Sequence, residues 1–272
     1  MSVTPSDPAG PNRLDHRLIE RCEEIPHHPE PGDYVVIDTF YFSNTVVELL
    51  HNGAECVHVT DERGEEFAYR EEHPRALLGG GATDAYEPVD GYDFFNSPSD
   101  VQRLDVAGRP VSMTSSNGGR AVATLRDRGD EGVSVFVGST TNAAALAEHL
   151  RERERDTYLV SAGTLGEVAA EDHIGAVLIS RHLDGLPLAA AERTLFRRQL
   201  ANAKGVGDGR THRLRRRDVT QYAMNLNGRR VVPELVGDTL VDVSARRGRH
   251  AALSQTVDRP AASPDRNFSS PN

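Results

Sequence analysis

Three acidic residues lie where a carboxylate could act on a bound ligand. Asp38 directly follows the apolar run at 34–37, and Glu171 and Asp172 open an amphipathic stretch. A carboxylate that ends a buried strand is costly unless it meets a metal ion, a cation or several N–H donors. We therefore expect Asp38, Glu171 and Asp172 to bind Mg²⁺ and to act as catalytic groups. Helix capping is the alternative role for Asp38, and since adjacent helical residues point about 100° apart, only one of Glu171 and Asp172 is expected to face the metal.

A second set of residues could bind a phosphate group. Residues 114–119 read TSSNGG, in which hydroxyls precede two glycines that let backbone N–H groups approach an anion, and Arg120 adds a planar bidentate donor. A plain β-turn with an exposed arginine is the alternative. Similar small polar residues follow two other apolar runs, so the predicted phosphate or substrate ligands are Thr114, Ser116, Asn117, Gly118, Arg120, Asn142, Gly163 and Thr164. Asn96 and Ser97 could equally cap a helix at Pro98 or reach the ligand.

The elements that would position these residues follow from the hydrophobic pattern. Apolar runs at 34–38, 55–59, 110–114, 133–137 and 157–161 alternate with amphipathic stretches at 44–52, 118–128, 141–153 and 170–182. This alternation predicts a three-layer α/β fold with a mainly parallel sheet and helices on both faces. Because parallel strands share a carboxyl-terminal edge, toward which helix N-termini point, we expect the ligand site at that edge.

The two ends of the chain and the region after 184 differ in character from this core. We predict a poorly ordered leader at 1–32, an α/β domain at 33–250 with two lobes as an option (boundary near 185), and a disordered tail at 251–272. After 184, the pattern predicts a helix at 189–204, a solvent loop at 205–209 and a closing hairpin around 231–243. The basic segment 210–217 lacks interleaved aromatic residues, which favours a helix face or subunit contact over a phosphate- or RNA-binding patch.

The composition limits the partners of the protein. Asp and Glu number 41 against 31 Lys and Arg, a formal charge of −10, and Lys204 is the only lysine. Such an acidic, arginine-based surface indicates a salt-adapted (halophilic) protein, with codon bias as the alternative, and it argues against nucleic acid as a partner. Cys22 and Cys56 imply no disulfide framework. Because neither a membrane span nor a signal peptide is recognisable, we expect a cytoplasmic protein with no membrane partner.

The order of the polar clusters resembles the motifs of the 2-phosphosulfolactate phosphatase (ComB-like) family of coenzyme M biosynthesis. The counterparts of six family motifs, beginning with VVID and ending with AED, are residues 35–45, 77–82, 96–98, 114–121, 138–143 and 161–172, with a weaker tail match from Asp218 to Leu240. The resemblance implies a Mg²⁺-dependent phosphatase, acting on a small anionic phosphoester and assembling as a homodimer.

The chain also departs from the family pattern. Tyr41 stands where the family has an arginine, Gly81 and Ala82 replace an acid and a second arginine, and Ser161 replaces a cysteine. Lost charge-assisted hydrogen bonds of roughly 1.5–3 kcal/mol each predict a less positive pocket. We expect phosphosulfolactate to be a poor substrate beside phosphoesters with a neutral second group, to which Tyr41 would present its ring. The alternative is a family member without catalysis that serves as a ligand-binding or scaffold protein.

Overall fold

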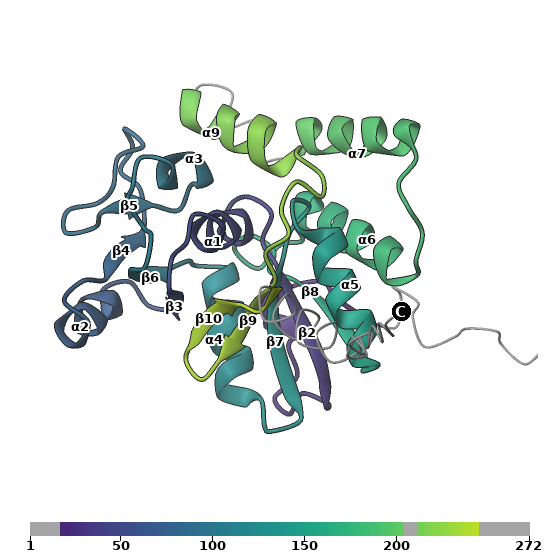
Figure 1. Ribbon diagram of the computed structural model, residues 1–272, viewed down its shortest axis with the longest axis horizontal. Coiled ribbons are helices and arrows are strands. Elements are labelled where there is room, and N and C mark those ends of the chain that lie inside the picture. Colours follow the sequence, from purple (N-terminus) through teal and green to yellow (C-terminus); the bar gives the residue numbers. More distant parts are fainter. Residues whose placement is uncertain (1–16, 204–211, 245–272) are drawn as a thin grey trace, which may run out of the picture.

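The computed structural model describes residues 17–203 and 212–244, and within them ten strands form one sheet (Figure 1). The order across the sheet is β1-β8-β2-β7-β9-β10-β3-β6-β4-β5. The strands are β1 (Leu18–Ile19), β2 (Gly32–Ile37), β3 (Cys56–Thr60), β4 (Leu77–Gly80), β5 (Phe94–Phe95), β6 (Pro110–Thr114), β7 (Val133–Gly138), β8 (Thr157–Ser161), β9 (Pro233–Val236) and β10 (Thr239–Asp242). The helices are η2 (Cys22–Glu24), α1 (Phe42–His51), α2 (Glu65–Glu72), α3 (Pro98–Val101), α4 (Gly118–Arg128), α5 (Ala143–Arg153), α6 (Ala170–Leu183), α7 (Ala190–Asn202), α9 (Arg213–Arg217) and η3 (Asp218–Ala223).

The sheet consists of two parallel blocks that an antiparallel hairpin joins. Strands β1, β8, β2 and β7 run parallel to one another, and so do β3, β6, β4 and β5. The hairpin β9–β10 lies between the blocks and pairs antiparallel with β7 and with β3. The predicted mainly parallel α/β sheet is confirmed. The hairpin expected near the end of the chain occupies the middle of the sheet, which the sequence does not indicate.

Helices cover both faces of the β2 block. Successive side chains of a strand point to opposite faces, and along β2 Tyr34 and Val36 join one core with residues of α1 and α4. Val35 and Ile37 join a second core with residues of α5 and α6. Because both faces are buried, the strand reads as a continuous apolar run. The predicted three layers are therefore confirmed.

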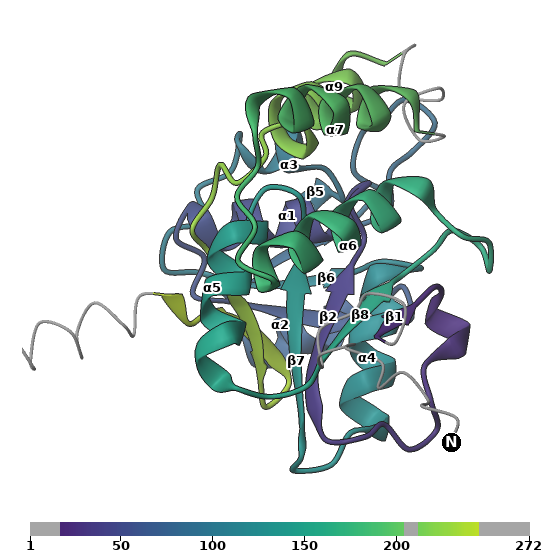
Figure 2. The same cartoon turned by 90° about the vertical axis from the view of Figure 1, so that its right-hand side faces the viewer.

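The chain after residue 185 returns to this same body. Figure 2 shows α7 and α9 at the end of the molecule toward which β7 points. Leu188, Phe196 and Leu200 belong to the core that also contains Phe136 of β7. Since one core extends past residue 185, the described residues do not divide into two lobes there.

The predicted poorly ordered leader is wrong for residues 17–32. Strand β1 pairs in parallel with β8, and Cys22 and Ile25 are buried against the core beside α1 and α4. Apolar residues too few to show a periodicity are enough to dock this segment, because the sheet edge and α4 supply the rest of the contact. The segments at 1–16, 205–209 and 251–272 lie outside the described residues. None of the helices in the described part of the chain combines the length and apolar character needed to cross a bilayer.

Candidate active site

The acidic residues singled out in the sequence meet where β2, β6 and β8 end. Asp38, the residue after β2, accepts a hydrogen bond through Oδ2 from the backbone N–H of Gly118 at the start of α4, at 3.0 Å. Asp172, in the first turn of α6, accepts two backbone N–H groups, from Thr39 at 2.8 Å and from Gly163 at 3.1 Å. These three bonds join the loops that follow the three strands. The structure thus brings Asp38, Gly118, Gly163 and Asp172 together at one edge of the sheet.

Glycine is required at two of these contacts. A Cβ on Gly118 would lie 2.8 Å from Oδ2 of Asp38 and 2.4 Å from the ring of Phe42. Gly163 has φ of +73°, and a Cβ there would lie 2.6 Å from the carbonyl oxygen of Glu167. The backbone N–H of Phe42, the first residue of α1, also stabilises the charged form of Asp38. The capping role considered for Asp38 is therefore present in part, together with its contact to α4.

The carboxylates repel one another in a buried setting. Burial and then the charge of Glu171, opposed by hydrogen bonds from the backbone of Gly118 and from the Ser115 side chain, raise the pKa of Asp38 to about 6. Burial and then the charge of Asp38 raise the pKa of Asp172 well above its ordinary value. A cation bound among these groups would relieve both costs.

A divalent metal ion fits this donor set as a two-carboxylate site. Within residues 17–203 and 212–244, no three His, Cys, Asp or Glu side chains are grouped as a ready-made metal site. Both oxygens of Asp172 already accept backbone N–H groups, which favours Glu171 over Asp172 as the member of this pair that faces a metal beside Asp38. One or two carboxylates plus waters and substrate oxygens are the usual ligands of Mg²⁺. The buried hydroxyls of Thr39 and Ser161, which have no hydrogen-bond partner in the described part of the chain, add polar character to the loops of the cluster.

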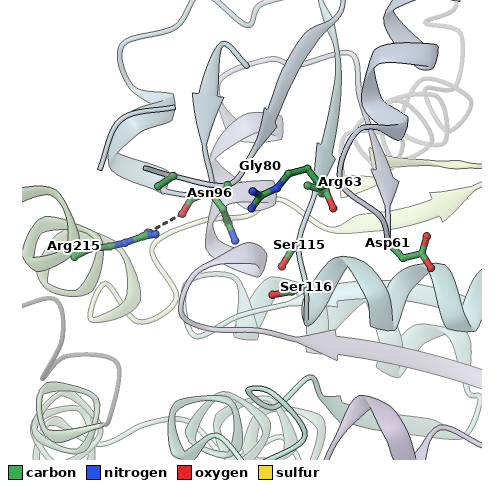
Figure 3. A pocket seen from close by; sticks show the side chains of 10 residues that line it. Asp61, Arg63, Gly80, Asn96, Ser115, Ser116 and Arg215 are labelled. Carbon is green, nitrogen blue, oxygen red and sulfur yellow. Dashed lines mark hydrogen bonds between the residues drawn. The ribbon is translucent and has the colours of Figure 1, made fainter. Parts of the chain in front are cut away.

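A pocket of about 290 Å³ adjoins the carboxylate cluster (Figure 3). Ser115 lines this pocket, and its side chain also stabilises the charged form of Asp38. The pocket and the carboxylate cluster therefore share this residue. Figure 3 shows Arg63 and Arg215 pointing toward one another with Asn96 between them, whereas the carboxylate of Asp61 points away. The lining residues are Asp61, Arg63, Gly80, Gly81, Ala82, Asn96, Thr114, Ser115, Ser116 and Arg215. Two guanidinium groups therefore line the pocket, although Tyr41 and Ala82 stand where the family pattern has arginines.

Arg215 is held at the pocket by rings and by an ion pair. Its guanidinium carbon lies 4.0 Å from the ring centroid of Tyr41 and 5.2 Å from that of Phe95. Its Nη1 donates to the backbone oxygen of Asn96 at 2.7 Å and to the buried carboxylate of Asp218 at 3.2 Å. The basic segment 210–217, expected to be a helix face or a subunit contact, forms helix α9 over Arg213–Arg217 and contributes Arg215 to the pocket. Tyr41, expected to present its ring to the substrate, instead supports this arginine.

Arg63 reaches the pocket from the loop after β3. The loop is ordered by Glu66, a buried carboxylate that accepts from the hydroxyl of Thr60 at 2.6 Å and from the backbone N–H of Gly64 at 2.8 Å. The guanidinium occupies the space beside Gly81, where a Cβ would lie 2.1 Å from Nη2 of Arg63. The glycine that replaces an acid of the family pattern therefore makes room for a cation.

Comparison with known proteins agrees with this geometry. The sequence profile described as 2-phosphosulpholactate phosphatase matches residues 19–235. The chain belongs to the 2-phosphosulfolactate phosphatase family. A protein of Deinococcus radiodurans named probable 2-phosphosulfolactate phosphatase is 31% identical over 245 residues, 84% of this chain and 97% of that protein. Proteins of the same name from Clostridium perfringens and Thermotoga petrophila are 34% and 32% identical, over 55% and 58% of this chain and 60% and 67% of their own length.

The family motif at 96–98 connects the pocket to Asp218, at the start of η3. Ser97 caps α3 by accepting the backbone N–H of Asp100 at 3.2 Å, and its hydroxyl donates to both oxygens of Asp218, at 2.8 and 2.9 Å. Asn96 lines the pocket, and its Oδ1 is buried without a hydrogen-bond partner among the described residues. The two roles weighed for this pair are thus divided, with Ser97 as the cap and Asn96 at the pocket.

Two predicted phosphate ligands of the family motifs are turned elsewhere. Arg120 forms an ion pair with Glu23 of the docked leader, so its guanidinium does not line the pocket. Asn142 accepts the backbone N–H of Ser139 at 2.8 Å and donates to the backbone oxygen of Val231 at 3.1 Å. Its amide therefore ties the β7–α5 connection to the segment that leads into β9. Neither Arg120 nor Asn142 lines the pocket, and their role as ligands stays a prediction.

The other predicted ligands lie at or beside the pocket. Thr114 and Ser116 line it. The side-chain oxygen of Asn117 accepts the backbone N–H of Leu165 at 3.4 Å, which joins the loop after β6 to the loop after β8. Thr164 belongs to that second loop, where its backbone forms a bridge with Glu167. These last two residues border the carboxylate cluster without lining the pocket.

Sequence reasoning missed Arg63, and it placed a phosphate-binding role of the segment that contains Arg215 second to a helix face or subunit contact. Residues 60–63 read TDER directly after the apolar run at 55–59 and form a strand-end cluster like those that were considered. Arg215 stands three residues before Asp218, where the tail motif begins. Both positions carried a readable signal, but nothing local shows that the two side chains meet.

Proposed function

We propose that this protein is a Mg²⁺-dependent phosphatase that hydrolyses a small anionic phosphoester, as the name of its family implies. The observation that carries the proposal is that Ser115 belongs both to the buried carboxylate cluster and to the polar pocket. A metal ion held by the carboxylates would therefore lie beside a phosphate held in the pocket. The relatives named as probable 2-phosphosulfolactate phosphatases support the same reaction class.

We assign the residues of the carboxylate cluster and of the pocket to different roles in this reaction. Asp38 and Glu171 would hold Mg²⁺, and Asp172 would position the loops that carry them. Bound Mg²⁺ supplies neutralisation of the negative charge on the phosphate oxygens. The hydroxyl of Ser116 would donate to those oxygens, and that of Ser115 would do so once Mg²⁺ on Asp38 replaces its bond to that carboxylate. The proton of the attacking water passes to Asp38 or Glu171, which act as alternative general bases.

A phosphate-release assay tests the proposal. Purified protein is incubated with a panel of small phosphoesters, with Mg²⁺ and with EDTA, and we expect release that depends on Mg²⁺ and is lost in Glu171→Gln. The matched control is Glu167→Gln, which alters an exposed carboxylate of the neighbouring loop and is expected to retain the activity. Release that continues unchanged in EDTA, or in Glu171→Gln, contradicts the assigned metal site.

A non-catalytic family member remains the second candidate. It is favoured by the absence of a three-residue metal site in the described ranges and by the replacements at Tyr41 and Ala82. In that case inorganic phosphate and Mg²⁺ would bind, as seen by calorimetry, without hydrolysis of any phosphoester in the panel.

We also propose a cytoplasmic homodimer from a salt-adapted organism. The excess of acidic residues and the resemblance support this assembly and setting. Light scattering coupled to gel filtration measures the mass, and a monomer mass across the working concentration range would contradict the dimer.

A further inference from the structure

Two arginines from distant parts of the chain face one pocket, and the proposed hydrolysis does not use them. Arg63 lies in the loop after β3 and Arg215 in α9, and Figure 3 shows both guanidinium groups directed toward Asn96. The reacting phosphate has its own partners in the carboxylate-bound metal and the hydroxyls of Ser115 and Ser116. The pocket therefore offers cationic donors beyond those that the reaction requires.

Arg215 is preorganised as a donor. Its guanidinium carbon lies 4.0, 5.2 and 5.5 Å from the ring centroids of Tyr41, Phe95 and Tyr86. Its hydrogen bonds to residues within 17–203 and 212–244 both start from Nη1, whereas a guanidinium carries five N–H donors on three nitrogens. A side chain already ordered by stacking loses little further entropy when it binds a ligand.

The pair with Asp218 leaves Arg215 able to bind an anion. The carboxylate of Asp218 is fully buried and also accepts the hydroxyl of Ser97 and the backbone N–H of Ser99 at 3.0 Å. It therefore divides its charge among three donors. The ion pair holds the guanidinium through Nη1, so Nε and Nη2 can serve a ligand in the pocket.

Arg63 supplies the opposing donor. It stands on a loop ordered by Glu66 and fills the space that a side chain at position 81 would occupy. Two guanidinium groups on opposite sides of a pocket of about 290 Å³ match a planar or tetrahedral oxyanion, which each can contact through paired donors. A neutral group in the same place would give neither guanidinium an anionic partner from the ligand.

We propose that Arg63 and Arg215 bind an acidic group, carboxylate or sulfonate, that the substrate carries in addition to its phosphate, and that they set the specificity of this enzyme. The inference rests on the proposed phosphatase function. It reverses the expectation drawn from Tyr41 and Ala82, that a neutral second group is preferred. The cations absent from the two strand ends are replaced by cations from α9 and from the loop after β3.

Binding of unreactive phosphonates tests the inference without turnover. Calorimetry at a fixed, saturating Mg²⁺ concentration compares methylphosphonate with phosphonoacetate and 2-phosphonoethanesulfonate, which add a carboxylate or a sulfonate. We expect Arg215→Gln and Arg63→Gln each to weaken the two bifunctional ligands by about ten- to a hundredfold, the value of one charge-assisted pair. Methylphosphonate should change by less than about threefold. Arg213→Gln, an exposed arginine of the same helix, is the matched control and should bind all three ligands like the wild type.

The outcomes are distinguishable. Equal weakening of methylphosphonate and the bifunctional ligands would show that the arginines bind the reacting phosphate, and unchanged binding would show that they bind neither group; both overturn the inference. The relative affinity of the two bifunctional ligands identifies the carboxylate or the sulfonate. If bifunctional binding follows the prediction while no phosphoester is hydrolysed, the inference stands and the proposed catalysis fails.

Substitutions at Tyr41 test the support of Arg215 separately. Tyr41→Phe keeps the ring and should leave bifunctional binding unchanged, whereas Tyr41→Leu removes the ring and should weaken it. A Tyr41→Phe variant that binds as poorly as Tyr41→Leu would instead assign the contact to the hydroxyl. Melting curves of every variant, recorded in the same buffer, show whether the folded protein is being compared.

Discussion

Asp38 combines a buried position, backbone donors and two carboxylate neighbours. Its side chain is 5% exposed, and its raised pKa reflects burial first and like charge afterwards. If this carboxylate served stability alone, a neutral side chain in its place would give a lower free energy of the folded state. Its presence is therefore best explained by a cation that binds there, and the next two predictions test this residue.

The first prediction concerns activity. Asp38→Asn keeps the volume and an oxygen that can accept the N–H of Gly118, but it removes the charge that would hold Mg²⁺. We expect Mg²⁺-stimulated phosphate release to fall by at least about a hundredfold with the fold retained. Activity and circular dichroism melting are measured on the same preparation. An unchanged rate would return Asp38 to the capping role.

The second prediction concerns the pH dependence of stability without metal. Because the pKa of Asp38 is raised to about 6 in the folded protein, its contribution is full below the unfolded value and is lost as pH rises through about 6. In EDTA, the wild type should lose on the order of 2 kcal/mol relative to Asp38→Asn between about pH 4 and pH 7. Urea unfolding at several pH values measures the difference. Parallel curves for the two proteins would contradict the raised pKa, and adding Mg²⁺ at neutral pH should restore stability to the wild type alone.

At the scale of elements, the segment that leads into the hairpin β9–β10 is tied to α1 by a buried ion pair. Glu48 of α1 is 1% exposed and accepts from Nε and Nη2 of Arg229 at 2.6 and 3.1 Å. Gln102, which follows α3, contributes a third contact at 3.3 Å. These contacts connect three segments, so they help to position the part of the chain that runs from Arg215 to the hairpin.

The third prediction removes this pair. Arg229→Ala leaves a buried carboxylate without its cation and should cost about 3 kcal/mol of unfolding free energy. The neighbouring Arg230→Ala is the control, because that side chain is 88% exposed and lies 3.8 Å from Glu148; its cost should stay below about 1 kcal/mol. Urea denaturation measures both, and Glu48→Gln should recover part of the loss in the Arg229→Ala background. Equal costs for the two arginines would contradict the assigned role.

At the scale of the whole molecule, the chain carries a formal charge of −10. Arginines are used in buried or half-buried pairs, such as those of Arg153 and Arg155 with the buried Asp33. Eight acidic residues of the described part of the chain are buried, so the surface carries only part of the surplus of acid. Repulsion among like surface charges opposes folding and is weakened by salt.

The fourth prediction follows from this repulsion. Raising KCl from about 0.1 M to about 1 M shortens the Debye length from about 10 Å to about 3 Å, and we expect the melting temperature to rise by several degrees. Differential scanning fluorimetry in a salt series measures it. A melting temperature that is flat or falls over this range would favour codon bias as the origin of the composition.

The sequence by itself determined the βα order, most of the strand and helix positions and the location of the carboxylates at strand ends. Apolar periodicity is a local property, and the parallel pairing of such strands gathers their ends at one edge whatever the loops contain. This is why the sequence alone predicts that the loops carrying Asp38, Asn117, Thr164 and Asp172 meet at one edge of the sheet.

Only the tertiary structure decided which side chains reach the pocket. Arg120 turns to Glu23 because the leader docks on α4, and Asn142 is used by the backbone of the tail. Arg215 lines the pocket because it stacks on the ring of Tyr41, and Arg63 does so because Gly81 has no side chain in the space that the guanidinium fills. These contacts join segments far apart in the chain, and their energies depend on distances and burial that no local pattern of residues contains.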